Sequence, residues 1–226
     1  MSKMSALLFF SLVSVVLCDY RNIHIKLDAE TEAFVVQAND VFHRICPSDD
    51  IDLRNKEQPH ITLYLTDFVN GTDAELISAI ESAINQFESF DVGLNNTVAV
   101  GQYGMWQTTI PRPLQDLSDL IVNATFHLVN PNQAVPEWIK NLPADEREKK
   151  LAMFKKYGSP NVFSSFQPHV TLCWDQSHNN VVRMLSSVPL GHPTSRIATV
   201  AIAHVGPHGT ALRGEDIASF SLSQFP

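Results

Sequence analysis

One six-residue segment occurs twice and constrains this chain more than any other feature. Gln58-Pro59-His60-Ile61-Thr62-Leu63 returns, with a single Ile-to-Val change, as Gln167-Pro168-His169-Val170-Thr171-Leu172. A further pair of similar segments follows in the same order, Val100-Gly101-Gln102-Tyr103-Gly104 and Val205-Gly206-Pro207-His208-Gly209. Similar segments that return in the same order indicate duplicated structural units. The sequence therefore predicts two similar lobes related by a rough two-fold axis.

The spacing of apolar residues predicts alternating strands and helices. Strands are expected at 21–27, 59–68, 90–100, 103–110, 168–174, 196–205 and 217–222, and helices at 29–45, 73–87, 114–128, 144–157 and 177–187. We expect an α+β fold, a bilobal duplicated arrangement with two antiparallel-rich sheets facing each other across a central cleft and helices outside. Residues 130–160, which hold four prolines around a charged helix, interrupt the repeat. They are expected to form a solvated insertion or a lid over a site.

Each copy of the repeated segment places a histidine and a threonine on one face of a strand. Side chains i and i+2 point to the same side, about 6.5–7 Å apart. His60, Thr62 and Tyr64 therefore share one face, and His169, Thr171 and Cys173 share the corresponding face of the second strand. Tyr64 is expected either to contact a substrate or to pack. Two such strands facing each other would direct two imidazoles and two hydroxyls at one point.

Two histidines and two threonines suit the cleavage of a phosphodiester. A neutral imidazole can remove a proton from the attacking oxygen while an imidazolium protonates the leaving oxygen. Threonine hydroxyls can donate hydrogen bonds to the non-bridging oxygens. With an ordinary pKa near 6.5 for both histidines, activity should peak between about pH 5 and 8. The sequence offers no convincing cluster of metal ligands, so neither a metal nor another cofactor is expected.

At these residues the chain resembles the 2H phosphoesterase superfamily, which is named for paired His-x-Thr/Ser motifs. The resemblance extends over the chain from residue 19 onward and includes both motifs, the duplicated lobes and the order of elements. It implies that His60 and His169 are the catalytic pair and that Thr62 and Thr171 bind the substrate. It also implies a nucleotide or short-oligonucleotide substrate, with hydrolysis of a 2′,3′-cyclic phosphate or of a 2′-5′ or 3′-5′ linkage.

Two other classes of function stay open. A protein that binds a nucleotide or phosphate ligand without turnover could retain the scaffold, although a binder has no need of two proton carriers. An RNA ligase would run similar chemistry in reverse, although water in excess favours hydrolysis. Which linkage is cut, which base is preferred and which histidine is the acid are not decided by the sequence.

Other histidines and aromatic residues are weaker candidates for the site. His-x-Thr occurs twice more, at His192-Pro193-Thr194 in a loop and at His208-Gly209-Thr210 in a turn. Only His208 is placed near a possible substrate, because it follows the second Val-Gly segment. The aromatic side chains that could stack on a nucleobase, with core packing as the alternative, are Tyr103, Trp106, Phe163 and Phe166.

The start of the chain predicts secretion. Lys3 precedes an apolar run from Ala6 to Leu17, and a cleavage site after Cys18 is plausible, which predicts a signal peptide over residues 1–18 and one domain over 19–226. Three Asn-x-Thr sequons begin at Asn70, Asn95 and Asn123. We therefore expect a glycosylated protein, secreted or in the lumen of the secretory or endolysosomal pathway, without a membrane-spanning segment after cleavage.

Charge and cysteine content limit the partners. The formal net charge is −8, and removal of the first 18 residues deletes one lysine and no acid. An acidic surface excludes tight binding of long duplex nucleic acid but leaves short phosphorylated ligands possible. We expect a monomer. Cys46 and Cys173 remain after cleavage, and either a disulfide or two buried thiols is compatible with the sequence.

Overall fold

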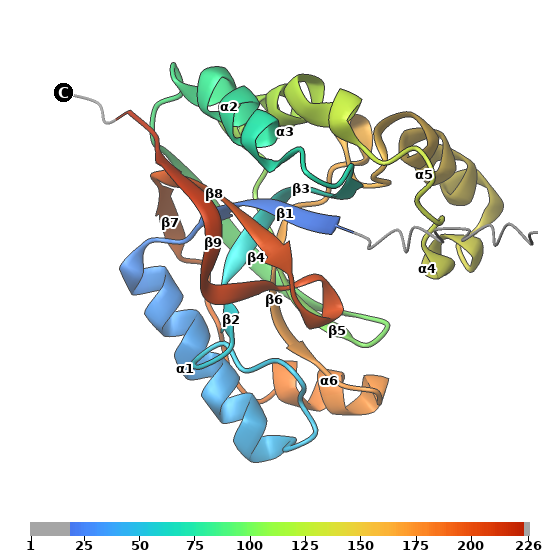
Figure 1. Ribbon diagram of the computed structural model, residues 1–226. Helices are drawn as coiled ribbons and strands as arrows, with labels where there is room; N and C mark the ends of the chain where they lie inside the picture. The colour runs from blue at the N-terminus through green and yellow to red at the C-terminus, as the bar shows by residue number, and fades with distance from the viewer. Residues whose placement is uncertain (1–18, 224–226) are drawn as a thin grey trace, which may run out of the picture.

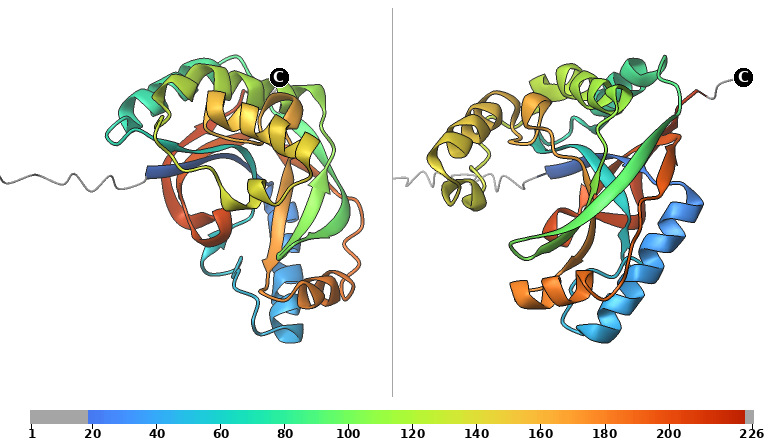
Figure 2. Two further views of the ribbon diagram at one scale, coloured as in Figure 1. Left: turned by 90° about the vertical axis from the view of Figure 1, so that its right-hand side faces the viewer. Right: turned by 180° about the vertical axis from the view of Figure 1, so that it is seen from behind.

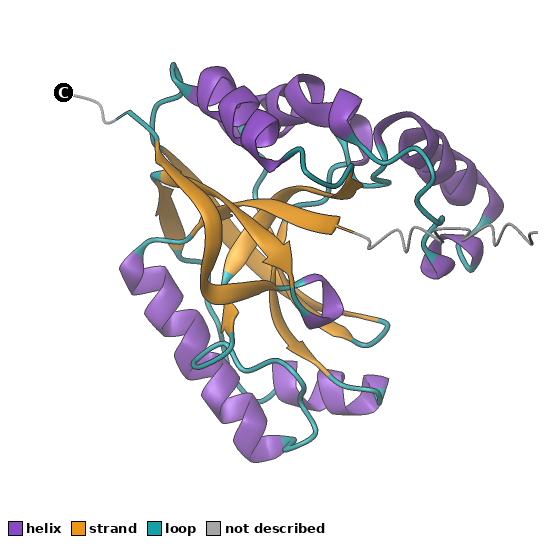
Figure 3. Cartoon of the chain, viewed as in Figure 1, coloured by secondary structure: helices purple, strands orange, loops and turns teal. Residues whose placement is uncertain are grey.

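The computed structural model describes residues 19–223; the predicted signal peptide lies outside the described residues. Within that part, nine strands form one antiparallel sheet in the order β2-β9-β8-β1-β3-β6-β5-β4-β7 (Figures 1 and 3). The strands are β1 (Asp19–Lys26), β2 (Glu57–Gln58), β3 (His60–Phe68), β4 (Phe90–Val100), β5 (Tyr103–Thr108), β6 (His169–Trp174), β7 (Thr194–Ile197), β8 (Thr199–Val205) and β9 (Ala211–Ser221). The prediction of an α+β fold is confirmed.

The α-helices lie on the outside of this sheet. They are α1 (Ala29–Ile45), α2 (Asp73–Ile84), α3 (Arg112–Thr125), α4 (Glu137–Lys140), α5 (Ala144–Tyr157) and α6 (His178–Leu185). Helices α2 and α3 pack together on one side of the sheet, and α1 and α6 pack together on the other (Figure 1). The longest helix, α1, has 17 residues, and no helix in residues 19–223 combines the length and apolar character needed to cross a membrane.

Helix α1 shows how local sequence sets an element's limits. It begins after Asp28, whose carboxylate accepts a hydrogen bond from the backbone N–H of Thr31 at 2.8 Å. Such a bond satisfies one of the free N–H groups of the first turn. Buried Val35, Ala38 and Phe42 recur along one face at helical spacing. The predicted limits, 29–45, agree with the structure.

The predicted duplication is visible in the strand order. The first unit runs β1-α1-β3-α2-β4 and the second runs β5-α3-β6-α6-β8, so the order β8-β1-β3 is mirrored by β4-β5-β6. Each unit contributes its last strand to the other half of the sheet. The two halves, which the sequence predicts as facing sheets, are joined edge to edge where Ile61 pairs with Val170. The pseudo-two-fold axis therefore passes between β3 and β6.

Two predicted strands at the C-terminal end differ from the structure. The strand expected at 196–205 is divided at Ala198 into β7, which pairs with β4, and β8, which pairs with β1 and β9. The backbone carbonyl of Ala198 accepts a bond from Leu222 at the break. The strand expected at 217–222 begins earlier, at Ala211. Charged residues around Gly214, which has φ +77°, hide the start of β9 from an apolar pattern.

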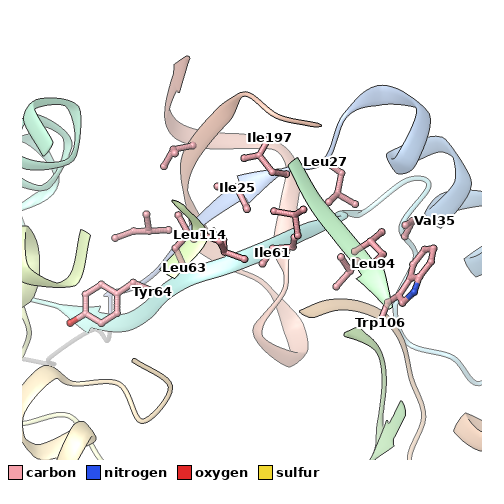
Figure 4. Packing of buried hydrophobic residues seen from close by; sticks show 14 of the residues in the cluster. Ile25, Leu27, Val35, Ile61, Leu63, Tyr64, Leu94, Trp106, Leu114 and Ile197 are labelled. Carbon is pink, nitrogen blue, oxygen red and sulfur yellow. The ribbon is translucent and has the colours of Figure 1, made fainter. Parts of the chain in front are cut away.

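The apolar face of the sheet forms the core together with the helices. Figure 4 shows Ile25, Ile61, Leu94, Leu114 and Ile197 in one cluster, and each of these side chains is fully buried. These residues come from β1, β3, β4, α3 and β7, so the core joins both halves of the sheet. Because the apolar side chains of β3 and β6 are anchored in this core, the positions of the alternating polar side chains are fixed as well.

The segment 130–160 is attached to β3 and contains α4 and α5. Helix α5 lies on the same side of the molecule as α2 and α3, and α4 packs against α5 (Figure 2). At its C-terminal end, Gly158 adopts φ +69° and its carbonyl accepts a hydrogen bond from Thr66 at 2.9 Å. The neighbouring Tyr157 carbonyl accepts a hydrogen bond from the hydroxyl of Tyr64. These contacts hold the segment against β3 four and six residues beyond His60.

Cys46 and Cys173 are both buried free thiols. Burial raises the pKa of Cys173, and the nearby carboxyl of Asp49 raises it further. Of the two alternatives that the sequence leaves open, the structure therefore shows unpaired thiols and not a disulfide. A thiol whose pKa is raised is a poor nucleophile.

Candidate active site

The two repeated segments meet at the centre of the sheet. The antiparallel pairing of Ile61 with Val170 places His60 level with Thr171 and Thr62 level with His169. This register puts the two imidazoles on adjacent strands, and the charge of His169 adds, after burial and His24, to the causes that lower the pKa of His60. Both predicted histidines and both predicted threonines are therefore brought together on two neighbouring strands.

The Gln-Pro-His part of each segment holds its imidazole in the same way. Nδ1 of His60 lies 2.7 Å from the carbonyl oxygen of Gln58, and Nδ1 of His169 lies 2.9 Å from that of Gln167. A carbonyl only accepts, so Nδ1 carries the proton and donates in both cases. The proline between glutamine and histidine fixes φ and gives the turn its shape. In both copies Nε2 is left as the nitrogen that can exchange a proton.

The two histidines differ in their surroundings. His60 is 7% exposed, and burial, followed by the charge of His24, lowers its pKa from 6.5 to about 3. His169 is only half-buried, and burial lowers its pKa as well. Desolvation disfavours the charged form of an imidazole, which is the physical cause common to both shifts. His60 is therefore neutral over the whole physiological range of pH.

Thr62 and Thr171 are half-buried next to these histidines. Neither hydroxyl forms a hydrogen bond with another group in residues 19–223. Two free hydroxyls beside two imidazoles can donate to the oxygens of an anionic group. The geometry is compatible with the predicted role of the threonines.

The predicted substrate contact of Tyr64 is not supported by the geometry. β3 contains a bulge, because His24 pairs with Thr62 while Ile23 pairs with Tyr64, so Leu63 is an extra residue. A bulge interrupts the alternation of faces. Tyr64 is consequently buried in the core, its hydroxyl donates to the Tyr157 carbonyl, and burial raises its pKa.

The same bulge occurs at the equivalent position of β6. Gly104 pairs with Cys173 and Met105 with Thr171, so Leu172 is the extra residue. Cys173 is turned into the core with Leu172, and both are fully buried. The predicted face of His169, Thr171 and Cys173 is therefore wrong in its third member, and half-buried Trp174 takes that place.

Three side chains of β1 belong to this site although they lie outside both repeated segments. Asn22, His24 and Lys26 alternate with buried Ile23 and Ile25 and thus face the same side as His60. His24 is 0% exposed, and its ring centroid lies 5.0 Å from that of His60. Burial lowers the pKa of His24 to about 4. The polar alternation of β1 was the available signal for these residues.

An aromatic group lies at the turns that follow the repeats. The ring of His208 stacks on Trp174, with centroids 3.9 Å apart and planes 16° apart, and lies 6.4 Å from Tyr103. Nε2 of His208 is 2.8 Å from a carboxylate oxygen of Asp50. His208 and Tyr103 occupy equivalent positions of the two Val-Gly segments, which explains why they meet near the axis.

The remaining candidates lie in other settings. Trp106 is fully buried and donates its indole N–H to the Asn95 carbonyl, and Phe166 is also in the core. Phe163 packs on Tyr157 with centroids 4.6 Å apart. His192 is exposed in the loop before β7, as expected for a His-x-Thr that occurs by chance.

Comparison with known proteins identifies the fold. No protein-family model matches the chain, and no curated protein matches it by sequence. The structure of E. coli LigT complexed with 3′-AMP has a TM-score of 0.54 and 14% identity, covering 92% of this chain and 100% of that chain. A structure described as a phosphoesterase gives 0.53 and 14%, covering 91% and 99%. The protein TT0787 of Thermus thermophilus gives 0.53 and 13%, covering 92% and 100%. The chain shares the fold of these proteins over nearly its whole described length.

Proposed function

We propose that this chain is a phosphodiesterase in which His60 and His169 act as general base and general acid on a nucleotide or a short oligonucleotide. The observation that supports it most is the duplicated imidazole geometry. Each Nδ1 is bound to a glutamine carbonyl, which leaves two Nε2 atoms on neighbouring strands for proton exchange. A protein that only binds its ligand has no need of this arrangement, whereas proton transfer at both ends of a displacement requires it.

The reaction follows from these groups. The oxygen of water bonds to phosphorus while one imidazole takes a water proton, and the bond from phosphorus to the leaving oxygen breaks while the other imidazole supplies a proton. Thr62 and Thr171 donate to the non-bridging oxygens, and each such bond to a charged group contributes about 1.5–3 kcal/mol. No metal takes part in this scheme. Within residues 19–223, no three His, Cys, Asp or Glu side chains are grouped to hold one.

The substrate class is proposed from the charge of the chain and from the structural neighbours. The chain is acidic, with a formal net charge of −8, which disfavours a long polyanion. Solved structures of LigT carry the descriptions "complexed with" ATP, NADP+, phosphate and 3′-AMP. A 2′,3′-cyclic nucleotide and a 2′-5′-linked dinucleotide are therefore the first substrates to test. A monomer is proposed as the working unit.

The decisive experiment measures hydrolysis of these two compounds by the wild type, His60→Ala and His169→Ala. Each substitution should reduce turnover at least ~100-fold, the scale expected for loss of a general acid or base. Thr62→Ala and Thr171→Ala should each raise the barrier by about 1.5–3 kcal/mol. His204→Ala is the matched control, because His204 is an exposed histidine on β8. A folded His60→Ala or His169→Ala protein with nearly full activity would remove the two-histidine mechanism.

Secretion and glycosylation are part of the proposal. Asn70, Asn95 and Asn123, the first residues of the three sequons, are all exposed in the structure. Glycosylation requires such exposure. After expression in a eukaryotic secretory system, the protein in the medium should begin at Asp19 and lose mass on treatment with an N-glycosidase. Retention of residues 1–18 in a protein found only inside the cell would contradict this part.

A further inference from the structure

The pseudo-two-fold axis pairs each residue beside His60 with one beside His169. On β1, Lys26 is level with His60, His24 with Thr62, and Asn22 with Leu65. On β5 the corresponding residues are Gln107 beside His169, Met105 beside Thr171 and Tyr103 beside Trp174. The backbone is duplicated, but these three side-chain pairs are not. The two imidazoles therefore differ in neighbours although they are held alike.

Asn22 provides the sharpest difference, because its amide bonds directly to the reactive nitrogen of His60. Nδ2 of Asn22 lies 3.1 Å from Nε2 of His60 and 3.2 Å from the carbonyl oxygen of Gly209. The Gly209 carbonyl only accepts, so it requires the NH2 end of the amide on this side. The amide consequently presents a donor to His60, and Nε2 must be an acceptor. Tyr103, which takes the place of Asn22 in the other half, lies beside His208 and Trp174.

His24, which lies on β1 like Asn22, packs against the ring of His60. Its Nδ1 lies 3.2 Å from the backbone carbonyl of Asn22, so this nitrogen carries the proton. Its Nε2 and the Oδ1 of Asn22 are buried acceptors without a hydrogen-bond partner in residues 19–223. The donors and acceptors around His60 are therefore arranged for a neutral ring. Protonation of His60 at Nε2 would place the new N–H against the N–H of the Asn22 amide.

We propose that Asn22, supported by His24, is a positioning residue that fixes His60 as the proton acceptor and leaves His169 as the proton donor. The inference rests on the proposed phosphodiesterase function and assigns its two proton transfers. Water gives a proton to Nε2 of His60 as its oxygen bonds to phosphorus, after the Asn22 amide has released that nitrogen. The bond to the leaving oxygen breaks, and that oxygen receives the proton from Nε2 of His169.

The charged groups around His60 agree with this assignment. β1 contributes His24 and Lys26 next to His60, β6 contributes His169, and each of these three groups is a base. The carboxylate of Asp216 on β9 is the acidic group of this cluster, and it forms an ion pair with Lys26. An imidazolium at position 60 would thus have no carboxylate in this cluster as its ion-pair partner, because Asp216 is paired with Lys26.

Two esters that differ only in their leaving group can show which histidine is the general acid and which is the general base. We would compare uridine 3′-(4-nitrophenyl phosphate), whose leaving group needs no proton, with uridine 3′-(methyl phosphate), whose leaving group does. His60→Ala should lose at least ~100-fold in kcat/KM on both esters. His169→Ala should lose as much on the methyl ester but less than ~10-fold on the nitrophenyl ester. The reverse pattern, with His60→Ala spared on the nitrophenyl ester, would overturn the assignment.

The role of Asn22 is tested through the pH profile of the Asn22→Asp protein. A carboxylate cannot donate to Nε2 and favours the imidazolium, so the acid limb of kcat/KM should rise by at least ~1 pH unit. Asn96→Asp adds the same charge at an exposed position of β4 and should leave the limb unchanged. An unshifted limb in a folded Asn22→Asp protein would refute the positioning role.

Nitrogen NMR of the wild type tests the same idea without any turnover. Because the Asn22 amide donates to Nε2 of His60, His60 should show Nδ1–H with an unprotonated Nε2 down to about pH 4 and should protonate only after His169 as the pH falls. A His60 ring that protonates before His169 would overturn the proposal. If no phosphodiester is cleaved while NMR gives the expected order, the proposed function fails and the proposal that rests on it fails with it, but the asymmetry of the two rings stands.

Discussion

Replacement of His24 by methionine, the residue at the equivalent position 105, should flatten the acid side of the stability curve. His24 is 0% exposed, and burial lowers its pKa from 6.5 to about 4. Between these values the unfolded chain binds a proton that the folded protein does not, so the free energy of unfolding falls as the pH decreases. At pH 5 the loss due to this one residue is about 2 kcal/mol, using 1.36 kcal/mol per pKa unit. At pH 7.5 it is close to zero.

The measurement is urea unfolding of the wild type and His24→Met at pH 7.5 and pH 5.0. Loss of the hydrogen bond to the Asn22 carbonyl and any repacking change the free energy of unfolding of His24→Met equally at both pH values. The free energy of unfolding of His24→Met relative to the wild type should therefore be about 2 kcal/mol higher at pH 5.0 than at pH 7.5. His204→Met, a change at an exposed strand histidine, should show no such movement. A pH-independent difference for His24→Met would refute a buried neutral imidazole at this position.

The centre of the fold and of the site is predictable because the same six-residue motif occurs twice in the sequence. The two Gln-Pro-His-x-Thr segments predict that their histidines and threonines come together on two facing strands; the structure brings them together, but on adjacent strands of one sheet, paired through Ile61 and Val170. Strand periodicity was sufficient here because Ile61 and Val170 are anchored in the core. The elements with clear apolar spacing, such as α1 and β3, were placed within one or two residues.

The features that were missed depend on pairing between distant strands. The bulges at Leu63 and Leu172 change which side chains face the site, and an alternating pattern cannot show where an extra residue is inserted. Asn22 and His24 lie on a strand with no copy of the repeated motif, so their proximity to His60 follows only from the register of β1 on β3. The exchange of β4 and β8 between the halves likewise requires the sheet order.

Excess EDTA should leave phosphodiesterase activity unchanged, because two imidazoles supply both proton transfers; activity lost to EDTA and restored by a divalent cation would contradict this. Gly158→Ala should lower the free energy of unfolding by about 2–5 kcal/mol in urea, since it combines a left-handed backbone with crowding. Three side-chain atoms lie 2.3–2.5 Å from the new Cβ position, whereas Gly71→Ala, with nothing within 4 Å, should cost only the backbone strain. The kcat/KM profile should be bell-shaped and displaced to acid pH. A neutral base loses activity as the pH falls through the lowered His60 pKa of about 3, and a protonated acid loses activity as the pH rises through the His169 pKa, which is below 6.5. The maximum should therefore lie on the acid side of pH 6.5, in the lower part of the range that two unperturbed histidines predict. A maximum at about pH 8 or above would show that no protonated histidine is needed in the free enzyme, and the acid role of His169 would have to be given up.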